Sequence, residues 1–307
     1  MNVNVINNFK DNFDTLILPV SKKREINSQN KELDKKINKY INLYSFSYSD
    51  DKFLSFDLEV DTELKQVILV NTDLLDNILI RDTLFDVFGK ISEKAKNILF
   101  INSDLFFDEY IITEIFILRY YKFIKYIENS KKHKHHLFIL TNKDIDLTET
   151  IELANSVNTA RDLVNEPSNV LYPETLAESA LSLGEKYGFE VEVLNKKDIK
   201  KLKMECFLKV GEGSDKEPKL IILRYHGNKK DKNKIGLIGK GVTFDSGGLS
   251  LKPSDSMIEM KSDMAGAAAV ISAVCTASKM KIKKNIIGVI PACENMINGS
   301  SYKLGDI

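Results

Sequence analysis

The amino-acid sequence predicts an α/β protein of two domains. Short apolar runs alternate with helical patterns along its 307 residues, as in a sheet covered by helices. A chain of this length can bury two separate cores. The halves also differ in composition, because Gly89 is the only glycine among residues 1–145 and the other glycines follow residue 150. This shift predicts an N-terminal domain at 1–145 and a second α/β domain at 146–307.

In the first half, apolar runs predict short buried strands at residues 15–20, 66–70, 97–101 and 136–140. Residues 109–126 are apolar at helical spacing and predict a helix between the last two strands. Residues 22–39 are dense in Lys, Asn and Glu, and predict a solvated helix or loop. The histidines at 133–136 are interpreted as a polar surface turn rather than a loose metal site. We find no motif here that predicts chemistry.

In the second half, a helix is expected at 147–165, and Pro167 ends it because proline cannot continue the hydrogen-bond ladder. A second helix is expected from Pro173 to residue 187, with Gly188 as its C-cap. A helix rich in small residues is expected at 263–280. Apolar runs predict strands at 190–194, 219–225, 235–240 and 285–292. This alternation predicts a second sheet with its own helices.

Composition argues against several classes of protein. Basic and acidic residues number 44 each, and this balance does not favour a nucleic-acid partner. No apolar run reaches the ~20 residues of a membrane span, and no secretory signal is visible at the N-terminus. The cysteines, Cys206, Cys275 and Cys293, form no CxxC pair, and this pattern indicates reduced thiols in a cytoplasmic protein. With four histidines in all, a histidine-rich metal site is not expected.

The most informative segment, residues 239–253, begins where an apolar strand ends, and ligands gather at such strand ends in open α/β sheets. It contains Lys240, Asp245 and Lys252, and Asp263 follows at the start of the next predicted helix. Lys240 comes directly after a buried-looking run, so its ammonium must find a carboxylate or lose its proton. A neutral amine can ligate a metal. The pattern indicates an anionic or metal-binding loop without naming a reaction.

Each of these residues also has an ordinary structural interpretation. Asp245 fits a turn residue that stabilises its own backbone. Asp263 fits the N-cap of the helix after it, a role worth ~1 kcal/mol. Lys240 and Lys252 fit surface lysines, as most lysines are.

Four ordered blocks of the second half resemble the leucyl aminopeptidases, also called cytosol aminopeptidases or M17 metallopeptidases. They are Asn-Thr-Ala-Arg-Asp-Leu-Val-Asn-Glu-Pro at 158–167, Lys-Gly-Val-Thr-Phe-Asp-Ser-Gly-Gly at 240–248, Lys-Pro at 252–253 with Met-Lys-Ser-Asp-Met-Ala-Gly-Ala at 260–267, and Glu-Asn-Met at 294–296. The resemblance covers about residues 150–307 and implies a catalytic domain with a central mixed sheet. The first half resembles only the variable, macro-like N-terminal domain of that family.

The resemblance implies a two-metal hydrolase that releases N-terminal, Leu-like residues from peptides by attack of a metal-activated water. Lys240, Asp245 and Asp263 would be metal ligands, with Asp245 bridging the two ions and Asp263 also holding the substrate amine. Lys252 would be the catalytic residue that binds the scissile carbonyl and stabilises its oxyanion. Met260 is a candidate wall of the substrate pocket, and a core methionine fits equally well. The cofactors would be Zn²⁺, Mn²⁺ or Mg²⁺.

The family pattern continues with a block, Asn-Thr-Asp-Ala-Glu-Gly-Arg, that this sequence does not contain before it ends at Ile307. That block supplies two more metal-binding carboxylates and an arginine that holds bicarbonate. We therefore expect a C-terminally truncated catalytic domain, and expect the 307-residue chain alone to bind at most one metal weakly and to be inactive. Complete members form homohexamers. The alternative interpretation is a non-catalytic homologue that binds a partner or nucleic acid.

Overall fold

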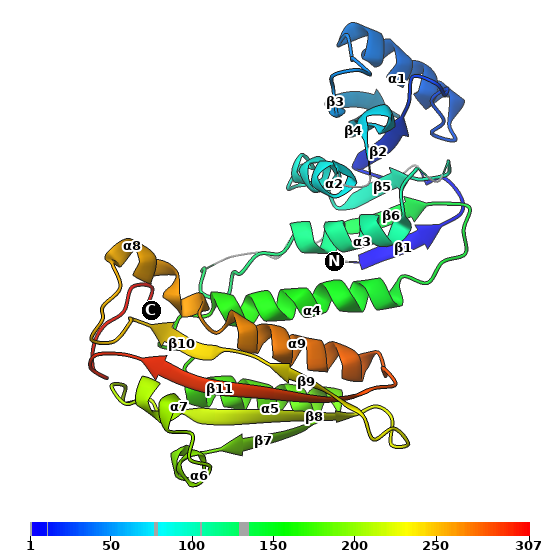
Figure 1. Cartoon of the computed structure of the whole chain (residues 1–307). Helices are drawn as coiled ribbons and strands as arrows, with labels where there is room; N and C mark the ends of the chain where they lie inside the picture. Colours follow the sequence, from blue (N-terminus) through cyan, green and yellow to red (C-terminus); the bar gives the residue numbers. More distant parts are fainter. Residues whose placement is uncertain (1, 11, 77–78, 105, 129–134) are drawn as a thin grey trace. The chain divides into compact units, whose positions relative to one another are not determined.

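The computed structural model describes residues 2–10, 12–76, 79–104, 106–128 and 135–307. It divides into two compact units, Met1–Ile151 and Glu152–Ile307 (Figure 1). Each unit contains a β-sheet with accompanying helices, and the predicted α/β class is confirmed. No helix in the described part of the chain combines the length and apolar character needed to cross a membrane.

The first unit is built on a six-stranded sheet with the strand order β1-β6-β5-β2-β4-β3. Its strands are β1 (Asn2–Ile6), β2 (Thr15–Val20), β3 (Phe53–Val60), β4 (Glu63–Asn71), β5 (Asn97–Ile101) and β6 (His136–Leu140). All neighbouring pairs are parallel except β3 with β4. Every residue of β2 is buried. Continuous apolar runs are expected of parallel strands that are covered on both faces, which is why the sequence identified the central strands.

The helical elements described in the first unit are α1 (Lys31–Leu43), the 3₁₀ turn η1 (Thr72–Leu74), α2 (Leu79–Gly89) and α3 (Glu109–Arg119). The segment predicted as a solvated helix or loop is a loop followed by α1. Asn30 separates the two, because its side chain caps the first backbone N–H groups of α1. The helix buries Leu33, Ile37 and Ile41, which share one face at four-residue spacing.

The helix predicted at 109–126 was too long, since α3 ends at Arg119. Its C-cap residue Tyr120 donates its hydroxyl to the Phe88 carbonyl at 2.7 Å, and its ring packs edge-on against Phe116. The apolar residues that follow residue 119 at helical spacing therefore lie outside the helix. The histidine cluster at 133–136 falls partly outside the described residues. Of the described pair, His135 is buried with its Nδ1 2.6 Å from the Ala95 carbonyl oxygen.

The second unit contains a five-stranded mixed sheet with the order β10-β11-β8-β7, in which β9 also pairs with β11. The strands are β7 (Glu190–Leu194), β8 (Lys219–His226), β9 (Lys234–Ile238), β10 (Gly241–Asp245) and β11 (Asn285–Asn295). Strand β8 is antiparallel to β7 and β11, whereas β9 and β10 run parallel to β11. In Figure 1, β11 lies between β8 on one side and β9 and β10 on the other. The predicted mixed sheet is confirmed.

The helices of this region are α4 (Thr148–Asn165), α5 (Pro173–Tyr187), α6 (Lys196–Lys201), α7 (Glu205–Val210), α8 (Ser254–Met257), the 3₁₀ segment η2 (Ile258–Ser262) and α9 (Ala265–Lys279). Helix α5 begins at Pro173 and ends at Tyr187 with Gly188 as its C-cap, as predicted, and Gly188 has φ +80°. Helices α5 and α9 contact each other and both contact β8 and β11, so one face of the sheet carries both. Their apolar residues form the core of the unit.

Candidate metal centre

The candidate site is built where β10 ends and the chain turns back towards α8. The loop closes through two hydrogen bonds of the Ser246 backbone, to the Asn295 carbonyl at 3.0 Å and from the Lys252 N–H at 2.9 Å. Gly247 has φ +86°, and a Cβ there would lie 2.4 Å from the Ser250 carbonyl oxygen. Only glycine fits this turn without displacing backbone.

Asp245, the last residue of β10, directs both carboxylate oxygens towards hydrogen-bond donors. Its Oδ1 accepts from the Gly247 N–H at 3.0 Å and from the Asn295 side-chain amide at 2.7 Å. Its Oδ2 lies 3.0 Å from the Lys252 Nζ. Burial, the largest influence, raises the Asp245 pKa, but Gly247, Lys252 and Asn295 together lower it below its ordinary value. Asp245 is therefore an ionised carboxylate at neutral pH.

A second ion pair joins Lys240 and Asp263, whose Nζ and Oδ1 are 2.7 Å apart. Two glycines permit it, because a Cβ on Gly239 would lie 2.5 Å from the Gly266 carbonyl oxygen. The start of α9 thereby comes close to the gap between β9 and β10. The other oxygen of Asp263, Oδ2, is buried and has no hydrogen-bond partner in the described part of the chain. A buried carboxylate oxygen without a donor is costly, so this atom is suited to a cation.

A buried thiol, that of Cys293, is under the electrostatic influence of Lys240, Asp245 and Asp263. Cys293 lies on β11 opposite Val242 and is 2% exposed. Burial, together with the charges of Asp245 and Asp263 and against that of Lys240, raises the pKa of its thiol to about 12. The structure thus brings together Lys240, Asp245, Lys252 and Asp263, which the sequence singled out. The thiol itself stays protonated and unreactive at neutral pH.

The ordinary interpretations of these residues have different outcomes. Asp245 does stabilise its own turn through the Gly247 N–H. Asp263 does not cap α9, because Met264 occupies the N-cap position and no side chain caps the helix. Met260 is half-buried on η2, and its carbonyl accepts from the Asp263 N–H at 3.4 Å. Its predicted role as a pocket wall stays a prediction.

Sequence reasoning gave no role to three residues that the structure places beside this site. Asn295 contacts Asp245 directly. Glu294, the residue before Asn295 on β11, forms a buried ion pair with Lys303. The available signal was the Glu-Asn-Met block at 294–296, since polar residues at the end of a buried strand need partners. Their partners are 50 or more positions away in some cases, which sequence spacing does not reveal.

The donor set suits a divalent cation but is small. Two carboxylates and one amine are oxygen and nitrogen ligands of the kind that Mg²⁺, Mn²⁺ and Zn²⁺ accept. Among the described residues, no group of three or more His, Cys, Asp or Glu side chains has the arrangement of a metal site. The ammonium groups of Lys240 and Lys252 balance the two aspartates here. The donor set of residues 1–307 therefore fits a divalent cation only in part, and a site for two ions needs further oxygen ligands.

Fold and site define an α/β protein with a carboxylate and lysine cluster at the end of a mixed-sheet strand. Residues 158–307 match the catalytic domain of the cytosol aminopeptidase family. The resemblance inferred from the four sequence blocks is confirmed by this match and by relatives named as probable cytosol aminopeptidases.

Relatives in two bacteria match both halves of the chain. A probable cytosol aminopeptidase of Fusobacterium nucleatum is 37% identical over 317 residues, which cover 100% of this chain and 65% of the relative. A probable cytosol aminopeptidase of Clostridium perfringens is 36% identical and covers 96% of this chain and 64% of its own length. The chain therefore spans slightly less than two thirds of these relatives.

Solved structures agree on the fold. A mutant of tomato leucine aminopeptidase has a TM-score of 0.78 at 22% identity, covering 100% of this chain and 65% of that one. The bottromycin maturation enzyme BotP in complex with Mn has a TM-score of 0.75 at 24% identity, covering 95% and 62%. At this identity the likeness concerns the fold alone.

Proposed function

We propose that the protein to which these residues belong is a two-metal aminopeptidase that releases Leu-like N-terminal residues from peptides. The observation that supports this best is the pairing of Lys240 with Asp263 and of Lys252 with Asp245 around the end of β10. The Oδ2 of Asp263, which no donor contacts among the residues that the structure describes, can accept a cation. In this proposal residues 146–307 are part of the catalytic domain, and residues 1–145 are the macro-like N-terminal domain.

Lys240, Asp245 and Asp263 would hold the cations, with Asp245 shared between them. Bound Zn²⁺, Mn²⁺ or Mg²⁺ ions would activate a water and polarise the scissile carbonyl. Asp245 is suited to this sharing because it is already ionised and partly desolvated. Asp263 is suited because one of its oxygens has no donor within the described ranges of the chain. Lys240 must give up its proton to act as a ligand, and its ammonium is now paired with Asp263.

Lys252 would act on the substrate rather than on the cations. Its Nζ lies at the open end of the loop, 3.0 Å from Asp245, with its side chain 30% exposed. An ammonium there can donate to a peptide carbonyl and stabilise the oxyanion that forms on attack. Asp263 would also accept from the free N-terminal amine, and Met260 would line the pocket for the first side chain.

The remaining parts of this proposal concern the whole protein. Further carboxylates and an arginine that binds bicarbonate would come from outside residues 1–307. Cytoplasmic location, peptide substrates and a homohexamer are proposed from the family. The 307-residue chain alone offers two carboxylates at the site, so we expect weak binding of at most one ion and no turnover.

Titration of the 307-residue chain with Mn²⁺, followed by calorimetry and electron paramagnetic resonance, tests the ligand assignment. Asp263→Asn and Asp245→Asn are expected to weaken the binding by about tenfold or more, since each removes one of few charged ligands. Asp255→Asn, an exposed carboxylate on α8, is the matched control and is expected to bind as the parent does. Equal affinity of all three variants would overturn the assignment. Metal-dependent hydrolysis of leucine amide by this chain would overturn its expected inactivity.

A further inference from the structure

The Glu-Asn-Met block at 294–296 has no role in the chemistry proposed above. It lies at the end of β11, beside the last residue of β10. We infer that Asn295 is the positioning residue of the site: it fixes the Asp245 carboxylate so that one chosen oxygen faces the cations. This inference rests on the proposed function for its consequence in metal binding, but the contact itself does not depend on that function.

Asn295 holds the metal-binding loop at two places. Its side-chain amide donates to Asp245 Oδ1 at 2.7 Å. Its backbone carbonyl accepts from both the Ser246 N–H at 3.0 Å and the Ser246 hydroxyl at 2.8 Å. The strand pairing shifts register between Val242 and Asp245, and this irregularity brings Asp245 directly opposite Asn295. Asn295 thus determines both the path of the loop and the rotamer of Asp245.

As a result, the two carboxylate oxygens of Asp245 have different hydrogen-bond partners. Oδ1 receives two donors that belong to the protein framework, Asn295 and the Gly247 N–H. Oδ2 faces only the movable ammonium of Lys252 among the described residues. A carboxylate held in this way loses little rotational freedom when it binds a cation, because the protein has already ordered it. Gly248 leaves room for the Asn295 side chain, since a Cβ at position 248 would lie 3.1 Å from the Asn295 Oδ1.

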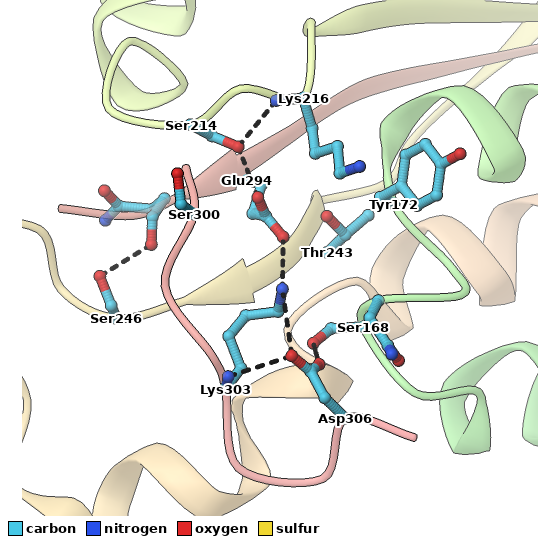
Figure 2. A network of polar contacts seen from close by, with 12 residues as sticks. Ser168, Tyr172, Ser214, Lys216, Thr243, Ser246, Glu294, Ser300, Lys303 and Asp306 are labelled. Carbon is cyan, nitrogen blue, oxygen red and sulfur yellow. Dashed lines mark hydrogen bonds and ion pairs between the residues drawn. The ribbon is translucent and has the colours of Figure 1, made fainter. Parts of the chain in front are cut away.

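A polar network holds Glu294, the residue before Asn295 on β11 (Figure 2). Glu294 is 1% exposed and accepts from the Ser214 hydroxyl, and its Oε1 lies 3.4 Å from the Lys303 Nζ. Lys303 in turn contacts Asp306 through its ammonium and its backbone N–H, and Asp306 accepts from Ser168. The network ties the end of β11 to three separate segments. Because breaking a buried charge pair is costly, the backbone of Asn295 has little freedom to move.

The test compares Asn295→Ala with a matched change on the same strand. Asn285 begins β11, as Asn295 ends it, and its amide likewise bonds neighbouring chain, the carbonyls of Asn228 and Asp231 at 2.9 and 2.7 Å. Asn285→Ala therefore removes similar hydrogen bonds far from Asp245. Both variants are prepared in the 307-residue chain, and folding is checked by circular dichroism.

The first readout is the hydrogen-exchange rate of the Gly247 amide, measured by NMR without metal. Asn295→Ala is expected to raise this rate about tenfold, because the acceptor Asp245 is no longer fixed, and Asn285→Ala to leave it unchanged. An unchanged Gly247 rate in Asn295→Ala would overturn the positioning role. This result does not depend on whether the site binds metal.

The second readout is the affinity for Mn²⁺ alone, by calorimetry. Loss of a residue that orients a ligand typically costs about 10- to 100-fold in metal affinity, and this is the loss expected for Asn295→Ala. Asn285→Ala is expected to stay within about twofold of the parent chain. Equal losses in the two variants would contradict a specific role for Asn295. Failure of the unmodified chain to bind Mn²⁺ at all would count against Lys240, Asp245 and Asp263 as ligands within this chain, and the exchange result would then decide the positioning.

Discussion

Two carboxylates, buried Glu109 in the first unit and partly buried Asp263 in the second, differ in how fully their oxygens are paired. Glu109 in the first unit is 1% exposed, and three side chains serve it: Asn102 at 2.9 Å, Thr141 at 2.8 Å and Lys143 at 2.9 Å. Asp263 in the second unit has one partner, Lys240, and its other oxygen has no hydrogen-bond partner in the described part of the chain. Glu109 has partners for both of its oxygens, whereas Asp263 has a partner for only one of its oxygens among the described residues.

This difference separates structural acids from candidate functional ones. A fully satisfied carboxylate stabilises its surroundings, and removing it leaves donors without acceptors. A carboxylate with an unsatisfied oxygen contributes little stability and keeps free binding capacity. The contrast predicts that substitutions in the first unit change stability, whereas those at the second site change ligand binding.

The largest effect is expected for Glu109→Ala. It leaves the buried amide of Asn102 and hydroxyl of Thr141 without this acceptor, and should lower the free energy of unfolding by about 3 kcal/mol. Urea denaturation monitored by circular dichroism measures the loss, and hydrogen exchange on peptides of each unit locates it. A change below about 1 kcal/mol would mean that the network contributes no more than an ordinary polar contact.

The next effect is the response of the first unit to acid. Burial tends to raise the pKa of Glu109, but Lys143 and Thr141 lower it below its ordinary value. The carboxylate therefore adds stability above the ordinary glutamate pKa of about 4.3, and this stability is lost as the pH falls towards the lower folded pKa. Urea midpoints recorded across this range should fall with pH, and Glu109→Gln should flatten the dependence. Parallel curves for the two proteins would contradict this.

A smaller change in stability is expected for Asp263→Asn. Neutralising an incompletely paired carboxylate should change the free energy of unfolding by less than about 1 kcal/mol, even though the side chain is mostly buried. The same variant is expected to lose Mn²⁺ affinity. Large destabilisation together with unchanged Mn²⁺ affinity would reverse the comparison and make Asp263 a structural acid.

The smallest effect is expected at an exposed pair, Lys209 with Glu212, whose Nζ and Oε2 are 2.7 Å apart. Both side chains are more than half exposed, so solvent and salt screen the attraction. Glu212→Ala should leave the urea midpoint unchanged within error. A measurable shift would show that distance alone, without burial, sets the contribution of charge pairs in this protein.

The sequence predicted best what depends on neighbouring residues. The buried strands of the first unit appeared as continuous apolar runs, and α5 was recognisable from Pro173 and Gly188. The site loop was found through its glycines and charged residues, with roles taken from the family resemblance. These features are local, so the sequence contains them directly.

What the sequence did not predict depends on distant partners. Residues 235–240 were expected to be one strand, but Gly239 and Lys240 separate β9 from β10, and both strands form only because β11 pairs with them. The bond from Asn295 to Asp245 spans 50 positions. Asp263 looked like a helix cap because the sequence does not show that η2 precedes α9 and puts Met264 in that position.

Strand β11 also determines the order in which the strands of the second sheet can pair during synthesis. Its residues 285–292 pair with β8, 285–289 with β9 and 292–295 with β10, so three strands depend on one. During synthesis from the N-terminus, β7 and β8 can pair early, but β9 and β10 must wait for a partner that emerges about 40 residues later. Pairing with β11 therefore determines when β10, which carries Asp245, is first held in place.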